Sequence, residues 1–235
     1  MSWIGGKKAL RDEIISRFPT DYKRYIEVFG GGGWVLFHKA PGNDFEVYND
    51  RNPNLANLYR CVRDHPDELI SELTYALNSR TDFDYIRKIM KTPTEIPDVK
   101  RAAYFYQLIR YSYASGLDSY ASQPHSMWNN FPLITNACAR LQKVVIENKD
   151  FEKLIDQYDR PESFFYCDPP YFETEDYYED ESRGAHIESI SRLSNIAQRY
   201  EAGKQYDELI ISNYDTKENR DSIRQLSFAD MIDET

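Results

Sequence analysis

A carboxylate, two prolines and a tyrosine follow one another at Asp168, Pro169, Pro170 and Tyr171. The apolar and aromatic residues 164–167 before them predict a buried strand, so Asp168 stands at its carboxyl end. The prolines fix two φ angles at about −65° and remove two backbone donors, which makes the next turn stiff. The carboxylate, the Pro169 carbonyl and the Tyr171 ring could hold a flat heteroaromatic amine. The alternative interpretation is an ordinary proline turn with a capping aspartate.

Four consecutive glycines, Gly30 to Gly33, lie between a strand predicted at 25–29 and a predicted helix start. Strand, glycine turn and helix open a nucleotide-binding α/β unit, in which bare backbone lies against the ligand. Asp50 ends a second predicted strand, close to the spacing of roughly 20 residues at which an acidic side chain binds ribose hydroxyls. Leu36 replaces the third glycine of a dinucleotide fingerprint, and no P-loop lysine follows. The set predicts an adenosine-containing cofactor.

Two residues near the N-terminus, Trp3 and Lys7, flank the two glycines at positions 5 and 6, which predict a flexible turn. An aromatic ring and an ammonium beside a closely approachable backbone suit a ligand that carries a carboxylate. A frayed terminus with a packed tryptophan is the alternative interpretation.

Composition excludes several classes of protein. The 235 residues contain no apolar run near the roughly 18–20 residues of a membrane span and no segment like a signal peptide, so we expect no membrane partner. The cysteines, Cys61, Cys138 and Cys167, lack paired spacing, and the four histidines are scattered. These features predict reduced thiols in a cytoplasmic protein and no metal site.

Charge is distributed unevenly along the chain, whose net charge is −10. Residues 80–143 carry 9 basic and 5 acidic side chains, whereas residues 144–235 carry 10 and 23. Basic charge interleaved with rings such as Tyr113 and Tyr120 suits a nucleic-acid surface. Polar side chains in the loop at 116–132, Asn129 among them, could read base edges. A helical insertion with a solvated basic face remains the alternative.

Strands and helices are predicted to alternate along the chain, with a helical insert, which indicates a mostly parallel α/β sheet with a small second domain. The predicted strands are 25–29, 45–48, 144–146, 164–167 and 209–212, and the main predicted helices are 9–18, 54–77, 99–114, 151–158 and 187–200.

Taken in order, the motifs resemble those of the Dam-type DNA adenine-N6 methyltransferases, the alpha group of amino-methyltransferases. The resemblance covers about residues 1–215. It rests on a first motif at 3–7, a cofactor loop at 27–33, a ribose turn at 50–53, a recognition stretch at 110–116, a catalytic tetrapeptide at 168–171 and a later strand at 211–215.

The resemblance implies a Rossmann-like methyltransferase sheet formed by residues 1–77 and 142–235, with residues 78–141 as a helical target-recognition insertion. It implies a monomer that methylates N6 of an adenine flipped out of double-stranded DNA. S-adenosylmethionine would be the cofactor. The implied cofactor contacts are Trp3, Lys7, Phe29, Gly31, Gly33, Asp50 and Asp168; the catalytic residues are Asp168, Pro169 and Tyr171; and the DNA contacts are Arg110, Tyr113, Ser115, Tyr120 and Asn129.

Two positions depart from the family pattern. Val28 stands where the family usually has proline, and residues 227–235 offer little apolar material for the family's C-terminal strand hairpin. We therefore expect that hairpin to be missing or reduced. Alternative functions are a catalytically impaired DNA-binding relative, a methyltransferase of protein amides or RNA, and a nicotinamide enzyme. Asp168 disfavours the protein-amide alternative, because such enzymes usually carry asparagine there, and the absent third glycine disfavours the nicotinamide enzyme.

Overall fold

The computed structural model describes residues 7–92, 95–169, 186–193, 205–214 and 216. The chain divides into two compact units, and each is described by itself. The first comprises residues 1–7 and 22–169, and the second comprises residues 8–21 and 170–235.

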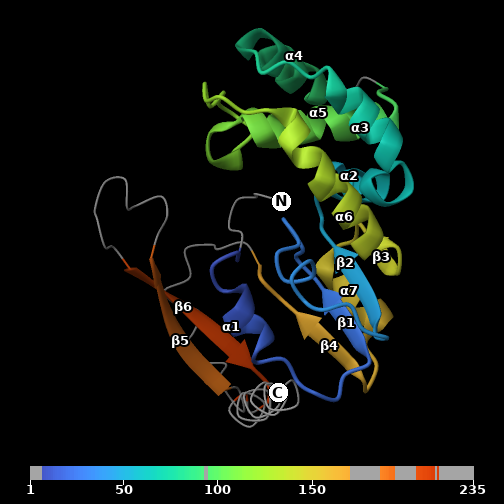
Figure 1. The fold of residues 1–235 in the computed structure, drawn as a ribbon. Coiled ribbons are helices and arrows are strands. Elements are labelled where there is room, and N and C mark those ends of the chain that lie inside the picture. Colours follow the sequence, from blue (N-terminus) through green and yellow to red (C-terminus); the bar gives the residue numbers. More distant parts are fainter. Residues whose placement is uncertain (1–6, 93–94, 170–185, 194–204, 215, 217–235) are drawn as a thin grey trace, which may run out of the picture. The chain divides into compact units, whose positions relative to one another are not determined.

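A four-stranded parallel sheet forms the centre of the first unit (Figure 1). Its order, β3-β2-β1-β4, is that of the first strands of a Rossmann sheet. The register aligns Glu27 with both Tyr48 and Tyr166, so the carboxyl ends of three neighbouring strands meet at one edge. The parallel α/β sheet predicted from sequence is therefore confirmed. The strands are β1 (Arg24–Glu27), β2 (Phe45–Asn49), β3 (Val144–Glu147) and β4 (Ser163–Tyr166).

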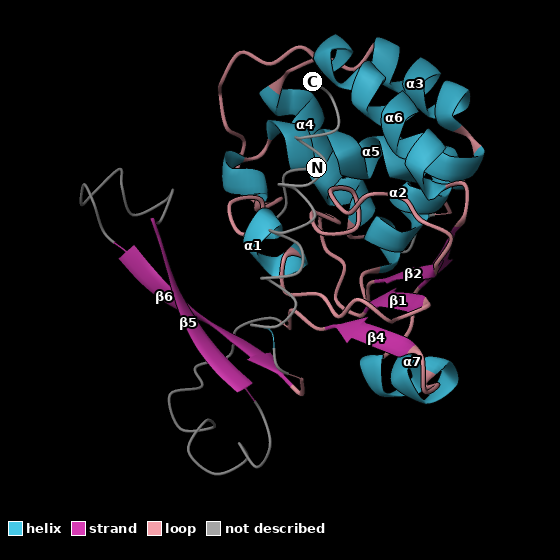
Figure 2. Ribbon diagram, turned by 60° about the horizontal axis from the view of Figure 1, so that its bottom comes forward, coloured by secondary structure: helices cyan, strands magenta, loops and turns pink. Residues whose placement is uncertain are grey.

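One face of this sheet packs on helix α7 (Phe151–Tyr158) (Figure 2). Side chains alternate between the faces of a strand, so Ile26 and Val47, which are paired in register, point to the same side. They form a buried cluster with Leu154 of the helix. Asp150 caps the helix, because its carboxylate accepts a hydrogen bond of 3.2 Å from the Glu152 amide.

Helices surround the other side of the sheet, and one predicted helix is divided in two. The helix predicted over 54–77 ends at Asp64, because Pro66 cannot donate the next backbone hydrogen bond and starts a new helix instead. The elements are α2 (Pro53–Asp64), α3 (Pro66–Thr74), α4 (Arg80–Met90), α5 (Asp98–Tyr111) and α6 (Phe131–Leu141), with 3₁₀ turns η1 (Tyr113–Ser115) and η2 (Met127–Asn130).

The second unit contains helix α1 (Arg11–Ile15) and the antiparallel strands β5 (His186–Leu193) and β6 (Gln205–Ser212). The helix predicted over 187–200 is wrong for residues 187–193. Apolar residues three positions apart fit a helix, but pairing with β6 selects the extended form. The strand predicted at 209–212 is confirmed as the end of β6, although its partner is β5 and not the parallel sheet.

Some predictions concern residues outside the described part of the chain. They concern Trp3, Tyr171, residues 194–200 and the residues after 216. The last group includes the segment for which we expect a missing or reduced hairpin. Among the described residues, no helix is long and apolar enough to cross a membrane.

We expect Leu154→Ala to lower the free energy of unfolding by about 2–5 kcal/mol, because it empties a fully buried position between α7 and the sheet. Urea unfolding measures the change. Leu133→Ala on α6 is the matched control, since Leu133 is 59% exposed, and it should shift stability by less than about 1 kcal/mol. Equal effects of the two substitutions would contradict this packing.

Candidate active site

Three predicted site segments meet at the carboxyl edge of the parallel sheet. The glycine run follows β1, Asp50 follows β2 and Asp168 follows β4. Because β1 lies between β2 and β4, the glycine run has Asp50 on one side and Asp168 on the other. The chain reverses its direction of winding between β1 and β4, and ligands of such sheets bind outside the strand ends at that point.

Asp168 forms an ion pair with Lys7, in which Nζ lies 2.8 Å from Oδ1. The lysine side chain is 9% exposed and the aspartate side chain 22%, so the pair is shielded but remains reachable. A charge-assisted contact of this length holds the carboxylate in one orientation. Pro169, the next residue, is exposed and has no backbone donor.

The glycine turn is held by Asp50 and Tyr48. The Gly31 amide donates to Oδ2 of Asp50 at 2.9 Å, and the Tyr48 hydroxyl donates to the Gly31 carbonyl at 2.7 Å. Oδ1 of Asp50 accepts from the Asn52 amide at 2.7 Å. Burial raises the pKa of Asp50, and the two amide hydrogen bonds partly oppose that shift. Each carboxylate oxygen keeps a further lone pair with which it could accept from a hydroxyl group.

Three glycines of the run are required for different reasons. Gly31 and Gly33 have φ values of 50° and 64°, in the left-handed region that side chains disfavour. At Gly30 an added Cβ would lie 2.2 Å from a ring carbon of Tyr48. That ring cannot easily move, because it packs edge-on against Tyr59 with centroids 4.7 Å apart.

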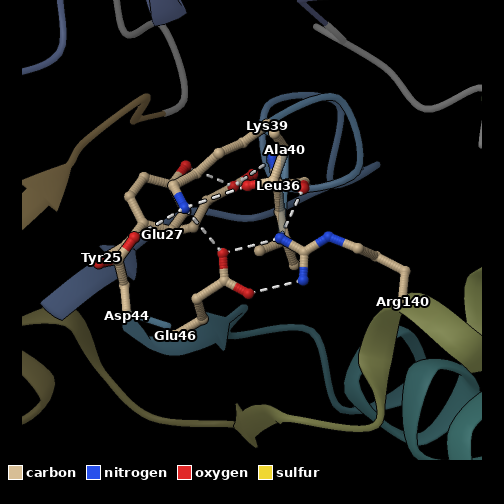
Figure 3. A network of polar contacts seen from close by, with 8 residues as sticks. All are labelled: Tyr25, Glu27, Leu36, Lys39, Ala40, Asp44, Glu46 and Arg140. Carbon is tan, nitrogen blue, oxygen red and sulfur yellow. Dashed lines mark hydrogen bonds and ion pairs between the residues drawn. The ribbon is translucent and has the colours of Figure 1, made fainter. Parts of the chain in front are cut away.

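A buried polar network surrounds Glu27 and Glu46 (Figure 3). These residues alternate along their strands with Ile26 and Val47, so their side chains point to the face of the sheet opposite α7. Oε2 of Glu27 accepts from the Tyr25 hydroxyl at 2.7 Å and from the Leu36 amide at 2.9 Å. Nη2 of Arg140, from α6, donates to the Leu36 carbonyl at 3.0 Å. The peptide groups on both sides of Leu36 are thus hydrogen-bonded to side chains, one to Glu27 and the other to Arg140. These contacts fix the segment after the glycines as a series of turns, where the sequence predicts the start of a regular helix.

Two cations neutralise the remaining charge in this network. The Arg140 guanidinium contacts both oxygens of Glu46 at 2.6 and 2.8 Å, and Lys39 contacts Glu46 and Asp44 at 3.2 Å each. Sequence reasoning missed all four residues. The available signal was Glu46 itself, a charged residue inside a short strand next to apolar neighbours.

The residues predicted to contact DNA lie in the last turn of α5 and in the segment between α5 and α6. Tyr113 and Asn129 are exposed, Arg110 and Tyr120 are partly buried, and Ser115 is buried. The structure therefore offers Tyr113 and Asn129 to a ligand most directly, whereas Ser115 packs inside.

Metal ligands do not gather in the part of the chain that the structure describes. There, no group of three or more His, Cys, Asp or Glu side chains could hold a metal ion. Cys61, Cys138 and Cys167 are free thiols.

The strand order, the glycine turn and the carboxylate at the end of β4 define a Rossmann-like methyltransferase fold. Residues 3–233 match the D12 class N6 adenine-specific DNA methyltransferase family. The chain belongs to this family, and it is an adenine-specific DNA methyltransferase.

The relatives include a DNA adenine methylase and type II methyltransferases. The chain is 28% identical to the DNA adenine methylase of Haemophilus influenzae over an alignment of 238 positions, which covers 94% of this chain and 81% of the relative. It is 30% identical to the type II methyltransferase M.MjaIII of Methanocaldococcus jannaschii over 198 residues, an alignment that covers 73% of this chain and 68% of the relative. It is also 30% identical over 190 residues to the type II methyltransferase M1.LlaDCHI of Lactococcus lactis, and this alignment covers 72% of this chain and 64% of the relative.

We expect Gly30→Ala to destabilise the chain by about 1–3 kcal/mol, because the new methyl group overlaps the Tyr48 ring. Thermal or urea unfolding measures the change. In the control Gly42→Ala, the methyl would meet only the end of the Asp44 side chain, at 3.1 Å, and that end can turn away. A Gly30→Ala chain as stable as the control contradicts the tight contact.

Glu27 makes stability depend on pH. Burial raises its pKa from 4.5 to about 8, so between these values the folded state binds more protons than the unfolded state. Its contribution to the free energy of unfolding is complete below pH 4.5 and is lost as the pH rises towards 8, by up to about 1.4 kcal/mol per pH unit.

Glu27→Gln removes this titration and keeps an acceptor for Leu36. We therefore expect the stability of wild type minus that of Glu27→Gln to fall steadily from pH 4.5 to about 8 in urea unfolding. A difference that is constant over this range would show that Glu27 titrates normally.

Proposed function

We propose that this chain transfers the methyl group of S-adenosylmethionine to N6 of an adenine turned out of duplex DNA. The single observation that carries the proposal is the position of Asp168. It follows β4 at the same sheet edge as the glycine turn after β1, and it is held there by Lys7. A base and a methyl donor could therefore meet between these two strand ends.

The residues at this edge fit the cofactor. The glycine turn exposes backbone to an adenosine, and the lone pairs of Asp50 left over from its amide bonds suit ribose hydroxyls. Lys7 supplies an ammonium for a carboxylate. Phe29 lies against Phe151, with ring centroids 5.8 Å apart, and offers an apolar surface beside the turn. When bound, S-adenosylmethionine supplies an electrophilic methyl group on a sulfonium.

Asp168 and Pro169 would prepare the amine for attack. The adenine amino group is a poor nucleophile, because its lone pair is delocalised into the ring. Hydrogen bonds from its two N–H groups to the Asp168 carboxylate and the Pro169 carbonyl favour a pyramidal nitrogen and localise the lone pair. Acceptors placed where positive charge develops can contribute on the order of 3–4 kcal/mol each. The ionised carboxylate can also take up the proton that the amine loses after transfer.

DNA would be bound by the basic helical segment. Residues 80–143 carry the chain's excess of positive charge, which suits phosphates. Tyr113 and Asn129 are exposed there and could meet bases, and Arg110, Ser115 and Tyr120 belong to the same segment. The recognition domain at 78–141, a monomeric state and a cytoplasmic location stay predictions.

We expect Asp168→Ala to lower methyl transfer by at least about 100-fold, because it removes one acceptor of the amine. The measurement is transfer of radiolabel from S-adenosylmethionine to duplex DNA. Asp156→Ala, at an exposed position of α7, is the control and should retain full activity. Full activity in Asp168→Ala, or a wild type that binds the cofactor and labels no DNA, would sink the proposal.

A further inference from the structure

The segment between α5 and α6 has an unusual backbone. Four of its non-glycine residues, Ala114, Ser115, Leu117 and Ser122, have φ between 49° and 65°. Side chains disfavour this left-handed region, so such a conformation persists only where surrounding contacts impose it. Residues 112–123, here called the recognition loop, therefore need external support.

The recognition loop is closed at its base by backbone contacts. Ser112 forms an antiparallel bridge with Tyr120, and the Ala121 amide donates to the Tyr111 carbonyl at 2.8 Å. The Tyr113 amide also donates to the Ser119 carbonyl at 2.8 Å, so these contacts join the two arms of the loop to each other, while the second arm needs further contacts to attach it to the helices.

Asn78, which lies outside the loop, holds its second arm at two points. The Tyr120 hydroxyl lies 2.8 Å from Oδ1 of Asn78 and 3.1 Å from its carbonyl oxygen, so both can accept from it. Nδ2 of Asn78 donates to the Gln123 carbonyl at 2.8 Å. Asn78 thus satisfies a side chain and a backbone group of the loop at once.

Helix α4, which begins two residues later, adds two arginines to this support. Nη2 of Arg80 donates to the Ser122 hydroxyl at 2.8 Å, and its guanidinium lies 4.9 Å from the centre of the Tyr120 ring. Arg87 donates to the Asp118 carbonyl. The contacts explain how a strained loop is kept in one shape, and they engage both the ring and the hydroxyl of Tyr120, which is partly buried.

We propose that Asn78 is a positioning residue for target-sequence recognition. It anchors Tyr120 and Gln123, and so fixes the loop conformation in which exposed side chains such as Tyr113 meet base edges. The Tyr120 hydroxyl then serves as an anchor and contacts no base. This inference rests on the proposed role of the loop in reading DNA. Base readout depends on hydrogen bonds whose geometry tolerates little displacement, so a loosened loop loses discrimination before it loses affinity.

The test uses Asn78→Ala, Tyr120→Phe and the double variant of the full chain. Each protein methylates genomic DNA that lacks adenine methylation, and sequencing of the modified adenines gives the preferred site. Synthetic duplexes then compare that site with versions altered by one base pair. We expect each single variant to lower this discrimination about tenfold. The loss in the double variant should be smaller than the sum of the two single losses, because both changes break the bond between the Tyr120 hydroxyl and Oδ1 of Asn78.

Two controls separate positioning from other roles. Lys88→Gln, at an exposed position of α4, should leave the preferred site unchanged, even if it flattens the salt dependence of DNA affinity as a lost phosphate contact would. Asn78→Ala should leave that salt dependence unchanged, because asparagine carries no charge. Its thermal unfolding and its affinity for S-adenosylmethionine should match those of the wild type, which excludes a general loss of structure.

Additive effects of Asn78→Ala and Tyr120→Phe would assign the Tyr120 hydroxyl a contact of its own with DNA and overturn the inference. Unchanged discrimination in an active Asn78→Ala chain overturns it as well, and leaves the proposed function intact. A wild type that methylates no DNA overturns both.

Discussion

The buried carboxyl of Glu27 is the constraint on which the turn after β1 depends. It is 2% exposed, and burying such a group is costly unless hydrogen-bond partners surround it. Tyr25 and the Leu36 amide are those partners, and Arg140 holds the carbonyl of Leu36. The bonds that compensate Glu27 therefore also determine the path of the chain beyond the glycines. The same hydrogen bonds therefore stabilise the core and fix the turn that follows the glycines.

The parallel pairing of the strands brings this turn together with the other groups of the candidate active site. Since β1 pairs in register with both β2 and β4, the groups that follow the three strands share one edge. Asp50 holds the Gly31 amide there and keeps lone pairs that a ligand could use. Lys7 brings a cation from the N-terminal segment to Asp168. The groups that we propose for adenine methylation thus follow strand ends, while the recognition loop is a separate, strained segment with its own supports.

Some elements followed from local pattern. The strands at 45–48 and 144–146 and the helix at 151–158 lie within a residue of their predicted bounds, because short apolar runs between turn signals leave few alternatives. The helix predicted over 54–77 failed at Pro66, where the ring removes a donor. The helix predicted over 187–200 failed because its apolar spacing also fits a strand once a partner is present.

The sequence by itself determined the chemical groups and their order along the chain: a glycine run, Asp50, and Asp168 before two prolines. Such motifs are local, since the chemistry requires neighbouring residues. Only the tertiary structure decided which side chains support them. Arg140 reaches a carbonyl 104 positions away, and Tyr120 reaches Asn78 across 42. Contacts of this range leave no periodic trace in the sequence, because they depend on how helices pack and not on spacing within any one element.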